Sequence, residues 1–315
     1  MINRRPSHTS PRSLTGSPYA RGTSVYYGSA GSRQPSEPPA KRHRYRRKGS
    51  LLLIMVVVLF GLHIFWAKQA SAEVAAAHEQ QLIMARQRAA TFTRQVNGLI
   101  AANPAVTFNV VTDSEADGVQ QYGADTTFDG ASTGKLLTAA DYLRHVQDGT
   151  ATLDQSIDGQ SAEQWLQAML VNSDDTAWAE LNGYLTHDDL QDYANSIGFT
   201  DYNPSVNTFT ARDVAVLLQK LYSGSLLDPA NRSLMLRYLA QANYRGYIVA
   251  AVPSSDMVYH KIGMDNDTVN DGAIITHGQQ YVVLVIFTDG NGTYDWGTRA
   301  QLMQTITQDA ITAYL

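Results

Sequence analysis

Apolar and polar positions divide the chain into regions of different character. Residues 1–49 show no apolar periodicity and are rich in Ser, Pro, Gly, Arg and Tyr, a composition that cannot bury a hydrophobic core. We therefore expect them to be disordered. Residues 51–67 form an uncharged apolar run that only Gly61 and His63 interrupt. Its length is close to the minimum for a bilayer-spanning helix, and we predict a transmembrane helix at 50–68.

After residue 68 the pattern predicts strands at both ends and helices between them. Residues 70–96 are rich in Ala, Gln and Arg and contain no Gly or Pro, which favours a helix that begins as a stalk and ends inside a domain. Apolar residues recur at helical spacing in the middle of the chain and again at 296–315. Strands are expected at 106–111 and 119–122, as a hairpin, and at 257–261, 272–276 and 281–287.

These elements indicate one fold class. Strands from both chain ends that flank a helical middle imply a single sheet closed by the two ends, which is an α+β arrangement. We divide the chain into a disordered basic cytoplasmic tail, a transmembrane helix, a helical stalk and one globular domain, at 1–49, 50–68, 69–89 and 90–315.

Charge sets the expected orientation of the apolar run. Residues 1–49 carry eleven Arg or Lys and one acid, and the basic cluster at 41–48 directly precedes the run. Positive charge on that side favours a cytoplasmic N-terminus, so the domain would be exported. The competing interpretation is a cleaved signal sequence, because Ala70-Ser71-Ala72 has the small-x-small form that signal peptidases accept. Both interpretations place the domain outside the cytosol.

Composition excludes several kinds of chemistry. Topology and anionic lipid account for the basic tail, and residues 50–315 hold thirteen basic against twenty-eight acidic residues, so we expect no nucleic-acid partner. The chain has no Cys, which excludes disulfides, thiol catalysis and Cys-based zinc sites. Its eight His residues are scattered without metal-ligand spacing. We expect neither a cofactor nor a metal.

One short motif suggests nucleophilic catalysis. Ser132-Thr133-Gly134-Lys135 is the sole Ser-x-x-Lys in the chain and lies at the start of a predicted helix. Positions i and i+3 share a helix face, so the Lys amine can approach the Ser hydroxyl and, when neutral, remove its proton. A capping Ser followed by a solvated Lys is the structural alternative.

Two further motifs follow downstream. Ser173-Asp174-Asp175 comes after a helical stretch at 162–170, and by itself it reads as a helix cap with acids in the first turn. His260-Lys261-Ile262-Gly263 ends a predicted strand just before a turn. Alternation along that strand points His260 and Lys261 to opposite faces, which favours a structural role for His260.

In this order, Ser-x-x-Lys, Ser-Asp-x and Lys-x-Gly resemble the motif set of the class A β-lactamase and penicillin-binding (DD-peptidase) serine hydrolase superfamily. The resemblance covers about residues 90–315 and implies an antiparallel sheet packed against a helical middle. It implies that Ser132 is the acylated nucleophile and Lys135 its base. Ser173 would relay a proton to the leaving nitrogen, and Lys261 would hold that relay and the substrate carboxylate electrostatically.

The same resemblance implies the remaining parts of the site. The backbone N–H groups of Ser132 and Met264 would form the oxyanion hole. Asp175, Ile262 and Gly263 would contact the substrate, a β-lactam or a cell-wall peptide of the D-Ala-D-Ala type. Asn243 and Tyr244 are expected to border the cleft.

The sequence departs from the family pattern at three places. Class A enzymes carry a Glu that activates the water for deacylation, whereas residues 199–207 contain one acid, Asp201, and no Glu. Asp175 replaces the usual Asn; if ionised, it would pair with Lys135 and keep that Lys protonated. Ile262 replaces the Ser or Thr whose hydroxyl contacts the substrate carboxylate.

These departures shape the expected function. Without a positioned base for water, acylation can proceed while deacylation slows. We therefore expect a single-pass protein of the bacterial cell membrane, with an extracytoplasmic serine hydrolase domain that forms an acyl-enzyme at Ser132 and releases it slowly. Two alternatives stay open: a catalytically impaired binder or sensor of cell-wall peptides, and an envelope protein that keeps only the fold.

Overall fold

The computed structural model describes residues 45–315, with side chains from residue 50 onward. The chain consists of two compact units, Met1–Ala67 and Lys68–Leu315. Helix α1 (Tyr45–Ala102) contributes to both. The predicted disordered tail lies outside the described residues up to residue 44, whereas residues 45–49 begin α1 instead of being disordered. Extending a helix by a few residues costs far less than starting one.

In the first unit, α1 carries the predicted transmembrane run. It is the one described helix that is long and apolar enough to cross a membrane: within Ser50–Ala102, an 18-residue stretch has a mean hydropathy of 2.5 and is not buried at all. The large apolar side chains from Leu51 to Trp66 are exposed. This is a weak indication of a membrane anchor, because a signal sequence would have the same properties.

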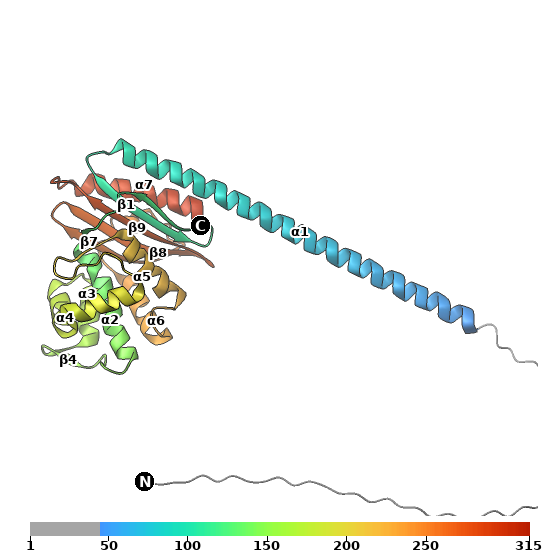
Figure 1. Cartoon of the computed structure of the whole chain (residues 1–315), viewed down its shortest axis with the longest axis horizontal. Coiled ribbons are helices and arrows are strands. Elements are labelled where there is room, and N and C mark those ends of the chain that lie inside the picture. Colours follow the sequence, from blue (N-terminus) through green and yellow to red (C-terminus); the bar gives the residue numbers. More distant parts are fainter. Residues whose placement is uncertain (1–44) are drawn as a thin grey trace, which may run out of the picture. The chain divides into compact units, whose positions relative to one another are not determined.

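The second unit is built on a five-stranded antiparallel sheet (Figure 1). Its strand order is β2-β1-β9-β8-β7, so the first strand pairs with the last one. This confirms the expected α+β fold with a sheet formed from both ends of the chain. The strands are β1 (Thr107–Ser114), β2 (Gly118–Gly123), β7 (Met257–Asp265), β8 (Thr268–His277) and β9 (Gln280–Asp289).

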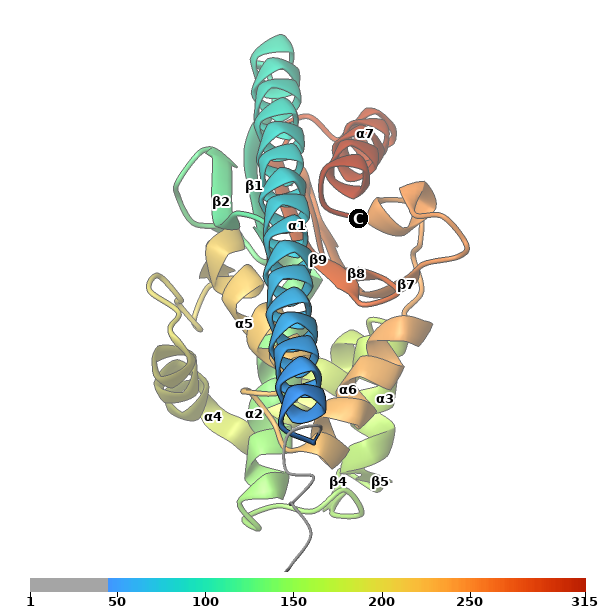
Figure 2. The same cartoon turned by 90° about the vertical axis from the view of Figure 1, so that its right-hand side faces the viewer.

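Strand β9 shows how one sequence pattern fills two cores. Its residues are apolar without interruption from Tyr281 to Phe287, because both faces of the sheet are covered. Val282, Leu284 and Ile286 belong to the core under α1 and α7 (Trp296–Tyr314). Val283, Val285 and Phe287 belong to the core shared with helices α2 to α6, which Figure 2 shows gathered below the sheet.

The helical region starts and stops at residues that suit those positions. Capping boxes begin α3 and α5, at Ser161 and Thr210, and Gly198 ends α4 in the left-handed conformation that glycine adopts without strain. The helices are η1 (Ala131–Gly134), α2 (Lys135–Gln147), α3 (Ala162–Val171), α4 (Asp175–Ile197), α5 (Ala211–Ser223), α6 (Pro229–Gln241) and η2 (Ile248–Ala251). Two small two-stranded sheets complete the unit. In one, β3 (Phe128–Asp129) pairs with β6 (Thr208–Phe209), and in the other, β4 (Ser156–Ile157) pairs with β5 (Gln160–Ser161).

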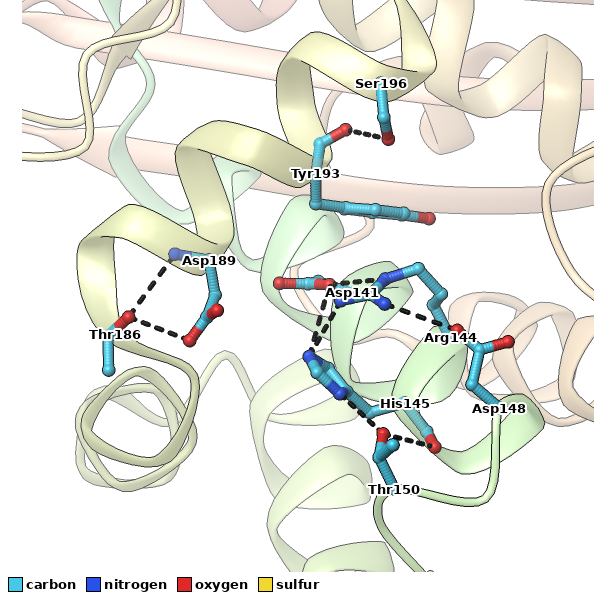
Figure 3. Close-up of polar contacts among 9 residues, drawn as sticks. All are labelled: Asp141, Arg144, His145, Asp148, Thr150, Thr186, Asp189, Tyr193 and Ser196. Carbon is cyan, nitrogen blue, oxygen red and sulfur yellow. Dashed lines mark hydrogen bonds and ion pairs between the residues drawn. The ribbon is translucent and has the colours of Figure 1, made fainter. Parts of the chain in front are cut away.

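A buried polar cluster joins α2 to α4 (Figure 3). Asp141 on α2 is fully buried and accepts hydrogen bonds from Arg144, whose guanidinium lies 5.4 Å from the ring centre of Tyr193 on α4. Thr186 interrupts α4 with a non-helical backbone (φ 62°, ψ 160°), so that α4 is two helical segments joined by a kink. This joint matters for the site because α2 begins at Lys135 and α4 begins at Asp175.

Candidate active site

Ser132 and Lys135 lie where a short 3-10 turn meets a helix. The prediction placed Ser132 at the start of an α-helix; it lies instead in η1, and α2 begins three residues later at Lys135. The contact between them survives this difference, because i and i+3 residues of a 3-10 turn also lie one above the other. Lys135 Nζ is 2.8 Å from Ser132 Oγ, and the lysine side chain is fully buried.

Ser173 joins this pair from the loop before α4. Lys135 Nζ lies 2.7 Å from the Ser173 carbonyl oxygen and 3.3 Å from Ser173 Oγ. The backbone of Ser173 is left-handed (φ 59°), and the next residue, Asp174, caps α4 by accepting a hydrogen bond from Ala177 N. This tight entry into α4 aims both polar oxygens of Ser173 at the lysine.

Lys261 completes the cluster from the sheet. It lies on β7, an edge strand, and its Nζ is 2.8 Å from Ser173 Oγ and 2.8 Å from the carbonyl oxygen of Ile262. The Ser173 hydroxyl therefore lies between two lysine amines. The four residues that the sequence singled out come from η1, α2, the loop before α4 and β7, and the structure brings them together.

The two lysines have altered pKa values. Burial and, to a smaller extent, the neighbouring charge of Lys135 lower the pKa of Lys261 to about 7, although the charges of Asp271 and Asp175 oppose them. Burial also lowers the pKa of Lys135, but the hydrogen bond and charge of Asp175 oppose this effect. Asp175 Oδ1 lies 2.6 Å from Lys135 Nζ, so the pairing expected from the sequence is present.

Gly263 allows β7 to approach the serine. A Cβ atom at Gly263 would lie 2.7 Å from the carbonyl oxygen of Gly130 and 2.9 Å from the backbone nitrogen of Ser132. These neighbours are backbone atoms, which cannot move aside without displacing η1, so only glycine fits here. β7 and η1 are thereby held in direct contact.

The strand geometry also orients Met264. In a β-strand, residues i and i+2 present their backbone N–H and C=O groups to the same edge. The Ile262 carbonyl faces Lys261 Nζ on the cluster side, so the N–H of Met264 points to that side as well. The Ile262 side chain is buried and offers no polar group, whereas the Met264 sulfur accepts a hydrogen bond from Tyr247 at 3.2 Å.

Three further residues singled out from the sequence lie near the cluster along the chain or the strand. His260 points to the other face of the sheet, where it contacts Asp271 at 3.2 Å and the carbonyl of Ala242 at 3.4 Å, as a structural residue would. Asn243 bonds Asn172, directly before Ser173, at 2.9 Å. Tyr244 follows with a left-handed backbone (φ 62°) and an exposed side chain.

Two residues near the serine were not found from the sequence. Asn207 has a left-handed backbone (φ 51°); its side chain donates to the carbonyl of Ala131 at 2.9 Å, and its own carbonyl accepts from Gly130 N. The one available signal was that Asn tolerates this conformation better than most residues. Trp178 lies with its ring centre 5.3 Å from Lys135 Nζ. A tryptophan within a helix gives no signal for such a contact.

Comparison with known proteins agrees with this geometry. A model of the β-lactamase enzyme family matches residues 91–314, while no curated protein matches the chain. The solved structure of PBP-A is similar with a TM-score of 0.66 at 19% identity, covering 71% of this chain and 95% of PBP-A. A mutant of PBP-A, solved as an acyl-enzyme complex with penicillin G, gives 0.67 at 20% identity, covering 71% and 96%.

An ancestral class A β-lactamase has a TM-score of 0.64 at 23% identity, covering 70% of this chain and 99% of the ancestral protein. At such identities these structures show a shared fold. The family model spans more than half of the chain, and this chain therefore belongs to the β-lactamase enzyme family, within the superfamily of serine β-lactamases and penicillin-binding proteins.

Proposed function

We propose that this protein is an extracytoplasmic serine hydrolase that forms an acyl-enzyme at Ser132 with a β-lactam or with a D-Ala-D-Ala-like amide of a cell-wall peptide. One observation carries the proposal: Ser132 Oγ, Lys135 Nζ, Ser173 Oγ and Lys261 Nζ form a chain of contacts between 2.8 and 3.3 Å. A serine hydroxyl in contact with a buried amine is one arrangement that activates the hydroxyl as a nucleophile.

In the acylation step, Ser132 Oγ attacks the carbonyl carbon and its proton passes to neutral Lys135 Nζ. The negative oxygen of the tetrahedral intermediate accepts hydrogen bonds from the N–H groups of Ser132 and Met264. The C–N bond then breaks. The leaving nitrogen takes a proton from Ser173 Oγ, and Lys135 returns its proton to Ser173. Lys261, when charged, holds Ser173 in place and attracts the substrate carboxylate.

Deacylation is slow in this proposal because residues 199–207 contain no counterpart of the Glu that activates water in class A enzymes. Asn207 contacts Ala131, beside the nucleophile, but an amide cannot accept a proton as a general base. Asp201, the acid in the same segment, is exposed and accepts a hydrogen bond from its neighbour Thr200. Asp175, the carboxylate that does reach the cluster, is paired with Lys135.

We place the protein in a bacterial cell membrane by a single span. In this arrangement residues 1–49 are cytoplasmic, 50–68 span the bilayer, 69–89 form a stalk and 90–315 form the external domain. The exposed apolar side chains of α1 and the basic residues before them support this topology. Cleavage near Ala72 is the alternative, and the mass of the mature N-terminus separates the two.

A fluorescent penicillin tests the proposal. Wild-type protein should become covalently labelled, with the mass increase on the peptide that contains Ser132, and Ser132→Ala should abolish the label. Ser255→Ala, which changes an exposed serine outside the cluster, should label normally. A well-folded wild type that takes up no label would refute the hydrolase. Label that persists for hours would support slow deacylation, whereas rapid turnover of nitrocefin would contradict it.

The Asp175–Lys135 ion pair favours a second candidate, a binder or sensor of cell-wall peptides. The Asp175 carboxylate at 2.6 Å opposes the lowering of the Lys135 pKa and so favours the protonated form, which cannot act as a base. A binder would show no covalent label at all, and it would keep its affinity for a muropeptide after Ser132→Ala. Calorimetric titration of wild type and variant with the same muropeptide distinguishes the two functions.

A further inference from the structure

We infer that Asp175 selects acyl donors that carry a protonated amine on the acyl side of the scissile carbonyl. This inference rests on the proposed acylation of Ser132 and names the class of substrate that the site favours. It concerns a residue at which the chain departs from the pattern of the family it resembles, so the specificity would be this chain's own.

Asp175 lies close to Ser132 because both side chains contact the amine nitrogen of Lys135. Asp175 Oδ1 and Ser132 Oγ both contact Lys135 Nζ, at 2.6 and 2.8 Å, so the two oxygens cannot be farther apart than the sum of these distances. The Asp175 side chain is 84% exposed. When a carbonyl carbon meets Ser132 Oγ, the atoms attached to that carbon therefore come within reach of an accessible carboxylate.

Asp175 presents a carboxylate that suits a cation. Asp175 lies in the first turn of α4, where the helix dipole favours negative charge, and its Oδ1 pairs with Lys135. Its Oδ2 forms no hydrogen bond with any residue in the described part of the chain. An ionised carboxylate can only accept hydrogen bonds, so it repels a substrate carbonyl oxygen and attracts an ammonium group.

Burial decides which charges a substrate meets. Lys135 and Lys261 are almost completely buried, with 0% and 1% exposure. Asp174 and Asp175 are exposed at the start of α4. Asp174 is engaged in capping α4, so the accessible carboxylate beside Lys135 that a substrate cation meets is that of Asp175.

A matched pair of antibiotics tests the inference. Ampicillin is penicillin G with one added amino group on the acyl side chain, so the two share the same β-lactam and differ by one ammonium. The rate of Ser132 acylation by each is measured by mass spectrometry on the full-length protein. Because a charge-assisted hydrogen bond is about twice as strong as a neutral one, we expect ampicillin to react about tenfold faster.

Asp175→Asn should bring the ratio of the two rates close to one. The substitution also changes Lys135 as a base, but that change affects both antibiotics equally and cancels in the ratio. Asp174→Asn is the matched control: it removes the neighbouring charge, Asn caps a helix as well as Asp does, and the residue does not contact Lys135 through a hydrogen bond. Its ratio should stay close to that of the wild type.

A second measurement needs no variant. The preference of the wild type should disappear above about pH 8, where an α-amino group loses its proton. A ratio near one at neutral pH, or a preference that Asp175→Asn or high pH leaves unchanged, overturns the inference while the acyl-enzyme stands. If neither antibiotic labels Ser132, the proposed function itself fails.

Discussion

Lys135 and Lys261 are both buried, yet their surroundings differ in a way that assigns them different tasks. Lys135 contacts a carboxylate, which opposes the effect of burial on its pKa. Lys261 contacts a hydroxyl and a backbone carbonyl, and its pKa is lowered to about 7. Near neutral pH the site therefore contains one lysine, Lys135, that is paired with a carboxylate, and another, Lys261, that gains or loses its proton.

This difference predicts how acylation depends on pH. Lys261 is charged below its pKa and neutral above it, so its attraction for the carboxylate of penicillin G is lost as the pH rises through about 7. We expect the second-order rate of acylation to fall over that range. Lys261→Arg should remove the falling limb, because the guanidinium stays charged. The rate is followed by labelling from pH 5 to pH 9.

The opposite outcome would be equally informative. A rate that rises through pH 7 and loses this rise in Lys261→Arg would mean that neutral Lys261 accepts the serine proton by way of Ser173. The electrostatic role proposed for Lys261 would then be wrong.

At the scale of elements, α2 packs through Arg144 and Tyr193 against the second segment of α4, after the kink at Thr186. At this contact, the hydroxyl of Tyr193 is buried without a hydrogen-bond partner among the described residues. Tyr142, also buried and on α2, instead donates to the carbonyl of Thr152 at 3.0 Å. Replacing either tyrosine by phenylalanine removes one buried hydroxyl, which is unpaired in Tyr193 and hydrogen-bonded in Tyr142.

We expect Tyr193→Phe to stabilise the domain and Tyr142→Phe to destabilise it. Removing an unpaired buried hydroxyl relieves its desolvation cost, about 1 kcal/mol or more, while removing a paired one leaves a carbonyl unsatisfied and costs about as much. Urea unfolding followed by circular dichroism gives both free energies. Equal losses in the two variants would show that Tyr193 has a partner after all.

Regular elements were largely predictable, and the reasons are local. The hydrophobic pattern located the strands predicted at 257–261 and 281–287, which lie inside β7 and β9, and Gly198 marked the end of α4. Side-chain pattern and glycine conformation are properties of short segments. The three motifs gave the cluster of four residues through their order. Their geometry, including the 3-10 turn at Ser132, depends on the packing of β7 against η1.

Other features had no local signal. The kink at Thr186 lies inside a continuous helical pattern, and the contact of Asn207 with Ala131 joins segments that are far apart in the sequence. The contact between Trp178 and Lys135 depends on how α4 packs on α2. Long-range packing sets these positions, and spacing along one chain does not report it.

At the scale of the molecule, the two cores account for the second unit alone. The buried core residues begin at Ala89, and none comes from residues 50–67. Those residues instead expose large apolar side chains along α1. The stability of the domain should therefore be independent of the segment that the proposal places in the membrane.

We expect a protein without residues 1–67 to be soluble and to be acylated at the same rate as the full-length protein, since it retains both cores and all four cluster residues. The full-length protein should sediment with membranes and need detergent for extraction. Fractionation and labelling of both forms measure this. A truncated protein that aggregates or loses its label would show that the domain depends on the first unit.

The place of β1 in the sheet affects how the protein can be made. β1 pairs with β2 on one edge and with β9, the last strand, on the other. A two-stranded hairpin is only marginally stable in water, so a growing chain cannot complete its sheet before its final strands have been synthesised. For the export proposed above, this delay would leave the polypeptide unfolded during translocation, and the sheet would close only after the last strand has crossed the membrane.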